Sequence, residues 1–247
     1  MPNLIPMVLV AFAASAGASA AATDPVFPAA TPKGHYAALD GLPDWGGVWV
    51  LEPGPPPVPP QMKGDYLDHY LKAKAEAAVH HGEFARPGSS FCAPPGMPYQ
   101  MGVAQYPTEF LFTPGRVTLL FEAWTQVRRI FTDGRPQSDA EQTYYGQSIG
   151  HWHDGTLAVE TRGVKSSALI GQGMGHSDKE VITEQIHLSA EDPNLLVDDL
   201  TITDPDALAA PWTAHYHYRR HREWELLEYV CAENDRNPAD ESGHAKF

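Results

Sequence analysis

The chain of 247 residues is poor in cysteine, in basic residues and in long apolar runs. Its length suffices to bury a sizeable core, so the two cysteines need not be supplemented by metal ions or further disulfides. Only 17 basic residues stand against 31 acidic ones, which gives a formal net charge of −14. An acidic surface repels nucleic-acid phosphates and anionic lipid headgroups, so we expect neither as a partner.

Familiar catalytic signatures are missing as well. The sequence has no nucleophile elbow, no P-loop, no dinucleotide fingerprint, no His-Glu-x-x-His and no internal repeat. The glycines of 171–175 lack the preceding strand and following helix that a phosphate-binding loop needs. No segment beyond the N-terminus is apolar for long enough to span a membrane. We therefore expect neither an organic cofactor nor a membrane span.

The N-terminus has the pattern of an export signal. Residues 4–14 form a short apolar core, and the Ala-Ser-Ala of 18–20 fits the small-x-small rule for cleavage. The run is too short for a transmembrane helix. We expect residues 1–22 to be a signal peptide and the protein to be periplasmic or secreted.

Export gives meaning to Cys92 and Cys231. In an oxidising compartment an even number of cysteines favours a disulfide, and closing so long a loop stabilises a chain by roughly 4–5 kcal/mol in the chain-entropy treatment. Two unconnected buried thiols are the alternative. A lone thiol nucleophile is a further one.

Three regions follow the signal. Residues 23–61 are expected to be a proline-rich arm with a first strand near 42–51, ending in the polyproline-type connector 52–60. Residues 62–235 are expected to form the main domain, with one helix over 65–81 at its start. Residues 236–247 are expected to be a flexible tail.

From residue 108 onward the pattern is that of strands and turns. About eight short strands with tight links, and no helices between them, predict an all-β fold, either an antiparallel barrel or a sandwich. The last two expected strands, 211–221 and 224–231, read as a long hairpin. His153-Asp154-Gly155 marks another hairpin.

Strand alternation places Glu184 among apolar neighbours, because Ile182, Glu184 and Ile186 share one face. A buried carboxylate needs a cation, a donor or a proton. Glu122, which follows a run of leucines, raises the same question, and Arg128 or Arg129 are the candidate partners. A structural ion pair is one interpretation. The other is an acid–base residue in a polar-lined cavity, with a raised pKa at Glu184.

The histidines offer two kinds of site. His151 and His153, like His215 and His217, are two apart in a strand, so each pair shares a face and resembles zinc or copper ligation in type. An exposed cationic strand, or a turn histidine facing water, is the alternative explanation, and no strong ligand-spacing signature accompanies these pairs. His176, in the glycine-rich loop before the Glu184 strand, is the better acid–base candidate.

The chain resembles a large set of exported, mostly uncharacterised bacterial proteins over about residues 42–235. The resemblance rests on RRIFTDGR, GQSIGHWHDGTLAVET, GHSD, TDPDALAAPWT and EYVCAEN. It implies an all-β, lipocalin-like domain with a disulfide between Cys92 and Cys231, without an assigned activity. The hairpin of that set usually reads Trp-Glu-Gly-Asp, so His153 departs from it, whereas the shared GHSD favours His176.

These features predict a periplasmic barrel that encloses a small apolar or aromatic molecule. It either carries that molecule or acts on it as a lyase, isomerase or hydrolase, with His176 and Glu184 transferring protons and Arg128 or Arg129 orienting an anion. Aromatic pocket walls are expected, with core packing as the alternative, from Trp124, Tyr144, Trp152 and Tyr216.

Two other classes stay open. One is a non-catalytic envelope protein that binds a partner through the proline-rich arm and an exposed sheet edge. The other is a metalloprotein that uses His151, His153, His215 and His217.

Overall fold

The structure is a computed structural model that describes residues 36–55, 57–89, 92–103, 106–138 and 141–231. The expected signal peptide and flexible tail lie outside these residues. The described strands are β1 (Val48–Leu51), β2 (Thr108–Thr113), β3 (Arg116–Phe121), β4 (Gln126–Phe131), β5 (Gln147–His153), β6 (Thr156–Arg162), β7 (Val181–Leu188), β8 (Leu195–Thr203) and β9 (Trp212–His221). The described helices are α1 (Gly64–Val79) and the short 3-10 helices η1 (Ala37–Leu39), η3 (Tyr99–Gly102) and η4 (Ala123–Thr125).

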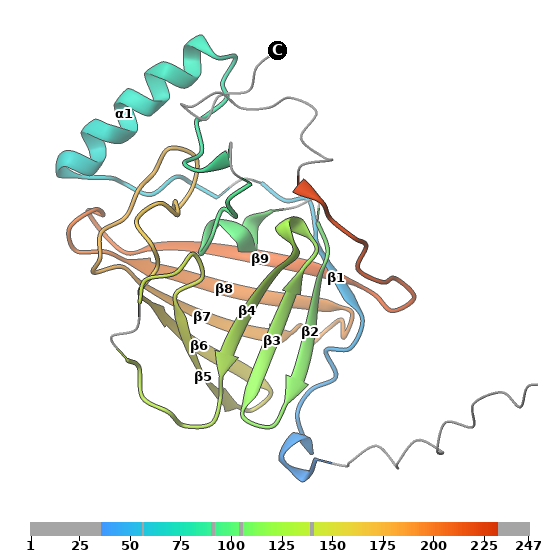
Figure 1. The fold of residues 1–247 in the computed structure, drawn as a ribbon. Coiled ribbons are helices and arrows are strands. Elements are labelled where there is room, and N and C mark those ends of the chain that lie inside the picture. The colour runs from blue at the N-terminus through green and yellow to red at the C-terminus, as the bar shows by residue number, and fades with distance from the viewer. Residues whose placement is uncertain (1–35, 56, 90–91, 104–105, 139–140, 232–247) are drawn as a thin grey trace, which may run out of the picture. The chain divides into compact units, whose positions relative to one another are not determined.

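The nine described strands close into one barrel in chain order, with β1 between β2 and β9 (Figure 1). Of the two expected all-β architectures, the barrel is therefore the one formed. The first strand, expected near 42–51, is β1, and it pairs with both β2 and β9. Every barrel strand has a neighbour on each side, so the exposed sheet edge expected for partner binding is not left by this closure.

One strand pair departs from the antiparallel expectation. β4 and β5 run parallel, in register at Ile130↔Ser148 and Phe131↔Ile149. A tight hairpin cannot join parallel strands, and here the link is the longer segment 132–146, which returns the chain before β5 begins. The other pairs of the barrel are antiparallel.

Two seams of the barrel are short. β1 and β2 pair only at Val48↔Glu109 and Trp49↔Thr108, and β4 and β5 also share two residue pairs. By contrast, β7 and β8 are paired over eight residues. The sheet β2–β3–β4 is thus joined to the other six strands by brief pairings on both of its sides.

Alternate residues fill the barrel interior, as the period of a strand requires. In β7 the buried residues are Ile182, Glu184 and Ile186, which confirms the face expected from the sequence. In β8 the buried set is Leu196, Asp198, Leu200 and Ile202. The interior is therefore an aliphatic core into which a few ionisable side chains are built.

The predicted helix is confirmed as α1, which lies at one end of the barrel (Figure 1). Its inner face carries Tyr66, Tyr70 and Ala77 at helical spacing, and Tyr70 stacks on Phe84 with ring centroids 6.4 Å apart. Gly173 lies close to this helix and to Phe84, since a Cβ there would be 3.1 Å from Ala73 Cβ and 2.6 Å from the Phe84 ring. None of the described helices is long and apolar enough to cross a membrane.

The prediction of a strand at 224–231 is wrong. This segment is not a strand, and the predicted hairpin with β9 does not form. Both edges of β9 are already occupied, by β8 and by β1, so no edge is left for a further strand. The segment ends at Cys231, which forms the expected disulfide with Cys92.

Candidate ligand-binding site

An ion pair between Arg128 of β4 and Glu184 of β7 lies inside the barrel, fully shielded from solvent. One guanidinium nitrogen, Nη1, donates to Glu184 Oε1 at 2.8 Å, and Nη2 contacts the other carboxylate oxygen. Arg128 also donates to the Ser148 hydroxyl at 3.2 Å and to the Thr161 hydroxyl at 3.0 Å. Burial lowers the pKa of Arg128, but the adjacent Glu184 carboxylate outweighs it and the pKa is raised.

Strand parity selects one arginine from the two candidates. Arg128 points inward, whereas Arg129 is exposed on the outer face of β4 and does not pair with Glu184. Glu122 also lies away from this pair, because its carboxylate accepts a hydrogen bond from the Leu227 amide at 2.8 Å. The interior chemistry thus involves Arg128 and Glu184 without Arg129 or Glu122.

Asp198 of β8 is an interior ionisable residue that the sequence analysis did not select. Its side chain is fully buried, and neither carboxyl oxygen has a hydrogen-bond partner within the described chain. Burial, then repulsion by the Glu184 carboxylate, holds the pKa of Asp198 well above its usual range, against the pull of Arg128. Asp198 therefore keeps its proton to higher pH than an ordinary aspartate.

Two tyrosines of β9 lie near this carboxyl group. Tyr216 is the cross-strand partner of Asp198. The Tyr218 hydroxyl donates to the main-chain oxygen of Met101 at 2.6 Å, and the Met101 sulfur lies 3.7 Å from Arg128 Nη1. Burial, followed by the nearby Asp198, raises the pKa of Tyr216. Tyr216 thus belongs to the polar part of the core.

His176 lies in a second buried cluster. Its Nδ1 is 2.9 Å from the Ser177 carbonyl oxygen and its Nε2 is 3.2 Å from that of Lys165. The carboxylate of Glu180 is 3.5 Å from Nδ1, and both oxygens of that buried carboxylate lack hydrogen-bond partners in the described chain. Burial, then the Asp204 charge, raises the pKa of Glu180 well above its usual range. Glu180 is a second residue that the sequence analysis missed, although it stands four positions after His176.

The predicted proton-transfer pair is not brought into contact. Across the described residues, no hydrogen bond or ion pair joins His176 to Glu184; His176 contacts Glu180 and Glu184 is bound by Arg128. Their joint catalytic role stays a prediction.

The two histidine pairs lie on separate parts of the barrel surface. His151 and His153 are exposed on β5, and His215 and His217 are exposed on β9, with β6, β7 and β8 between. Of these, His153 pairs with Asp154 at 3.1 Å and His215 with Asp199 at 2.5 Å. In the described residues no group of three or more potential ligands is placed to hold a metal ion.

The four predicted wall aromatics have different neighbours. Trp124 packs against Tyr106 and Tyr229, with centroids 6.1 and 5.8 Å away. Tyr144 lies beneath the Lys165 ammonium group at 5.5 Å. Only Trp152 among the four lines the pocket described next.

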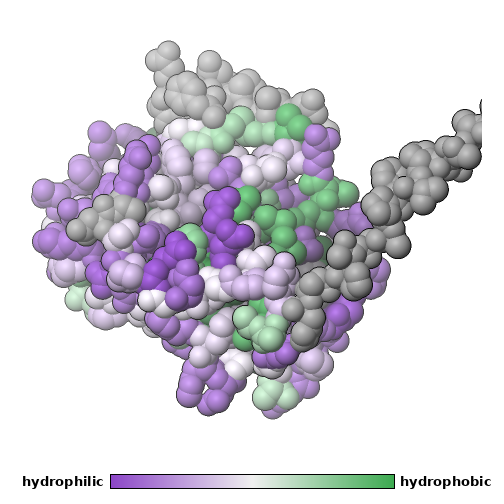
Figure 2. All heavy atoms as spheres, turned by 60° about the horizontal axis from the view of Figure 1, so that its bottom comes forward, coloured by the Kyte–Doolittle hydropathy of each residue, from purple (hydrophilic) through white to green (hydrophobic). Residues whose placement is uncertain are grey.

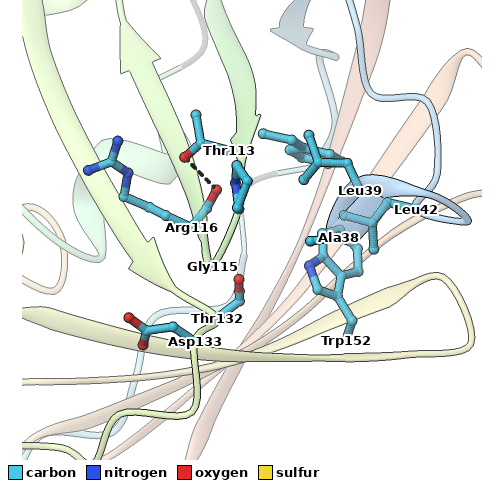
Figure 3. Close-up of a pocket in the computed structure, with 11 residues that line it drawn as sticks. Ala38, Leu39, Leu42, Thr113, Gly115, Arg116, Thr132, Asp133 and Trp152 are labelled. Carbon is cyan, nitrogen blue, oxygen red and sulfur yellow. Dashed lines mark hydrogen bonds between the residues drawn. The ribbon is translucent and has the colours of Figure 1, made fainter. Parts of the chain in front are cut away.

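An open pocket of about 440 Å³ lies at the barrel end that carries the β2–β3 and β5–β6 hairpins (Figure 3). Figure 2 turns this end forward and shows hydrophobic atoms gathered on that face with hydrophilic residues around them. The lining comes from the segment before β1, the β2–β3 hairpin, the end of β4, and β5. Its residues are Ala38, Leu39, Leu42, Phe112, Thr113, Pro114, Gly115, Arg116, Thr132, Asp133 and Trp152.

The aromatic wall of the pocket is held firmly. Trp152 and Phe112 meet edge to face at 5.4 Å, and each also contacts the buried Trp45, at 5.2 and 5.4 Å respectively. Trp45 is 1% exposed, so it anchors both rings from the core side. The wall is therefore formed before any ligand arrives.

A second part of the lining comes from the segment before β1, which is tied by local bonds. Leu39 and Leu42 are half-buried residues of the segment 36–42, whose main-chain hydrogen bonds run from Leu39 to Tyr36, from Asp40 to Ala37 and from Leu42 to Leu39. Each of these bonds stays within the segment. The two leucines thus contribute apolar surface that complements the aromatic wall.

No protein-family model and no curated protein matches this chain. The site must therefore be interpreted from its own chemistry.

Part of this site was accessible from the sequence. Trp152 was selected, and Phe112 shares strand parity with the buried Phe110, so alternation could have found it. Leu39 and Leu42 lie in a segment without periodicity. No local rule places that segment against a hairpin more than seventy positions later.

Proposed function

We propose that this protein binds a small apolar or aromatic molecule in the pocket lined by Phe112, Trp152, Leu39 and Leu42. The observation that carries the proposal is this preformed aromatic wall, which together with two half-buried leucines lines a pocket of about 440 Å³. Small-molecule pockets in proteins typically have volumes of about 300–1,000 Å³ and mostly apolar linings.

We propose further that binding takes place outside the cytoplasm, in the periplasm or after secretion. The apolar run at 4–14 with its small-residue cleavage pattern supports this, as does the Cys92–Cys231 disulfide, a bond that persists in oxidising compartments. The likeness to exported, lipocalin-like bacterial proteins points the same way.

The test uses N-phenyl-1-naphthylamine, an uncharged probe that fluoresces in apolar surroundings. We expect saturable fluorescence enhancement with the wild-type protein. Trp152→Ala should weaken binding about tenfold or more, because it removes half of the aromatic wall. Trp224→Ala is the matched control, since Trp224 is 50% exposed and stacks on His221 away from the pocket residues.

A second variant protects this test against loss of folding. Leu42→Ser removes apolar wall from a segment outside the buried core, so thermal unfolding should be little changed while probe binding weakens. Absence of saturable binding to the wild type, or equal affinities in all four proteins, contradicts the proposal.

Acid–base catalysis is the second candidate function, and buried carboxyl groups with raised pKa favour it, because such groups concentrate at catalytic sites. A molecule captured by the pocket from the producing cell provides the assay. Conversion by the wild type but not by Asp198→Asn or Glu180→Gln supports catalysis. Unchanged recovery from the wild type leaves a carrier.

A further inference from the structure

Two charged side chains, Arg116 and Asp133, line the pocket. Arg116 points away from the apolar walls, and Asp133 is bound by Arg135. In Figure 3 the Arg116 guanidinium extends away from Trp152, Leu39 and Leu42. The Asp133 carboxylate accepts hydrogen bonds from Arg135, at 2.9 and 3.0 Å from Nε and 2.6 Å from Nη2. The neighbouring Arg135 also lowers the pKa of Asp133. The buried Nε of Arg116 has no hydrogen-bond partner in the described chain, but the guanidinium lies away from the aromatic wall, so a ligand against that wall contacts neither charge directly.

One hydrogen-bond donor does face the pocket. The indole nitrogen of Trp152 lies on the side of its ring that faces the β2–β3 hairpin (Figure 3). An indole N–H is a donor only. Those of Trp49 and Trp212 donate to the main-chain oxygens of Trp45 and Val58, at 2.9 and 2.5 Å.

The Trp152 N–H does not donate to a main-chain oxygen of the described chain in this way. No protein acceptor is assigned to it in the described chain, and it is not among the buried unpartnered atoms, so it is accessible from the pocket. In the empty protein, water can take this hydrogen bond. A ligand that displaces the water without offering an acceptor loses that bond.

We infer that the ligand is an uncharged aromatic molecule with a carbonyl-type oxygen that accepts a hydrogen bond from the Trp152 indole N–H. This rests on the proposed function and makes Trp152 both a wall and a specificity-determining residue. A carboxylate in place of the carbonyl would have to leave water for a wall from which the Arg116 guanidinium is directed away, which disfavours anionic ligands.

Three matched naphthalenes test the inference. 2-Acetylnaphthalene has the ketone acceptor, 2-isopropenylnaphthalene is a hydrocarbon of nearly the same shape with a methylene group in place of the oxygen, and 2-naphthoate replaces the ketone with a charge. Competition against N-phenyl-1-naphthylamine gives their affinities. We expect the ketone to bind about fivefold more tightly than the hydrocarbon, as one net hydrogen bond provides, and the naphthoate at least tenfold more weakly than the ketone.

Trp152→Phe separates the donor from the wall, because it keeps an aromatic ring and removes the N–H. In this variant the preference for the ketone over the hydrocarbon should fall to less than twofold, while hydrocarbon binding stays within about threefold of wild type. Trp224→Phe should keep the fivefold preference.

The outcomes distinguish the two proposals. If none of the naphthalenes displaces the probe, or if Leu42→Ser does not weaken their binding, the pocket is not the binding site and the proposed function fails. If they bind there but the ketone preference is absent, or survives Trp152→Phe, the inferred ligand class is wrong. Tighter binding of the naphthoate also overturns it and points to Arg116.

Discussion

Glu184 and Asp198 are buried carboxyl residues on neighbouring strands, yet their surroundings differ. Both oxygens of Glu184 are bound by Arg128, while those of Asp198 have no partner in the described chain. A buried carboxylate needs a cation or donors, which Arg128 supplies to Glu184, whereas burial without a partner raises the pKa of Asp198. The interior thus holds one ion pair and one carboxyl group with a raised pKa.

The ion pair predicts a large effect from removing one member. Arg128→Met leaves the Glu184 carboxylate buried without its cation, so the free energy of unfolding should fall by about 3–5 kcal/mol. Arg128→Met combined with Glu184→Leu removes both charges and should recover much of that loss.

Urea unfolding measures both variants. Arg129→Met, one position along β4 but exposed, should change the stability by no more than about 0.5 kcal/mol. Similar losses for Arg128→Met and Arg129→Met would show that the buried pair has no special role in stability.

Asp198 predicts a pH dependence with a definite sign. Its pKa is raised in the folded protein, so the folded state binds more protons than the unfolded state above pH about 4. Its contribution to stability is complete below its unfolded-state pKa and is lost as pH rises through its folded-state pKa. The slope is at most about 1.4 kcal/mol per pH unit.

Asp198→Asn removes this titration and leaves that of Glu180 in place. The difference in unfolding free energy, wild type minus variant, should therefore decline as pH rises from 4 and then level off. Parallel stability curves for the two proteins between pH 4 and 8 would contradict the assignment.

At the scale of elements, the segment 222–231 shows what holds a non-strand segment in place. Besides the disulfide, it is tied by the Leu227 amide to Glu122 and by the Tyr229 carbonyl oxygen to the Thr125 hydroxyl, at 2.8 and 3.0 Å. These bonds connect it to η4 and to the link before it. The disulfide joins it to residues far earlier in the chain.

Removing that disulfide tests its contribution to stability. Cys92→Ser with Cys231→Ser should lower the free energy of unfolding by about 4–5 kcal/mol, because the unfolded chain gains the freedom of a loop spanning 139 positions. Denaturant unfolding of wild type with and without a thiol reductant is the independent measurement. Identical midpoints in the two conditions would rule out a stabilising crosslink.

Much of the element inventory could be predicted because its signals are local. Alternation placed Glu184 inward, turn residues marked the hairpins, and helical spacing identified α1. The parallel β4–β5 pair and the fate of 224–231 depend on barrel closure, which no local pattern encodes. The same applies to Arg128, whose partner depends on strand register across the barrel.

For the whole molecule, the buried ion-pair network and the open pocket lie in different parts of the barrel. The polar interior is packed with side chains that bind one another, as around Arg128, whereas the hairpin end has an open pocket whose lining includes aromatic rings and leucines beside polar residues. Trp45 connects the two regions, because it is buried in the core and contacts both pocket aromatics. The sequence predicted an all-β barrel or sandwich and one wall residue of the pocket, but not where the pocket would lie.

The two brief seams on either side of β2–β3–β4 are the places where we expect the strands of the barrel to separate most readily. Phe112 and the β2–β3 hairpin of the pocket would move with β2–β3–β4, while Trp152 would stay with the other six strands. Separation at the two seams breaks few main-chain hydrogen bonds between strands and moves the two aromatic rings apart. A ligand too large for the closed pocket would enter through such local opening. Among the barrel strands, we expect amide hydrogen exchange to be fastest at these two seams.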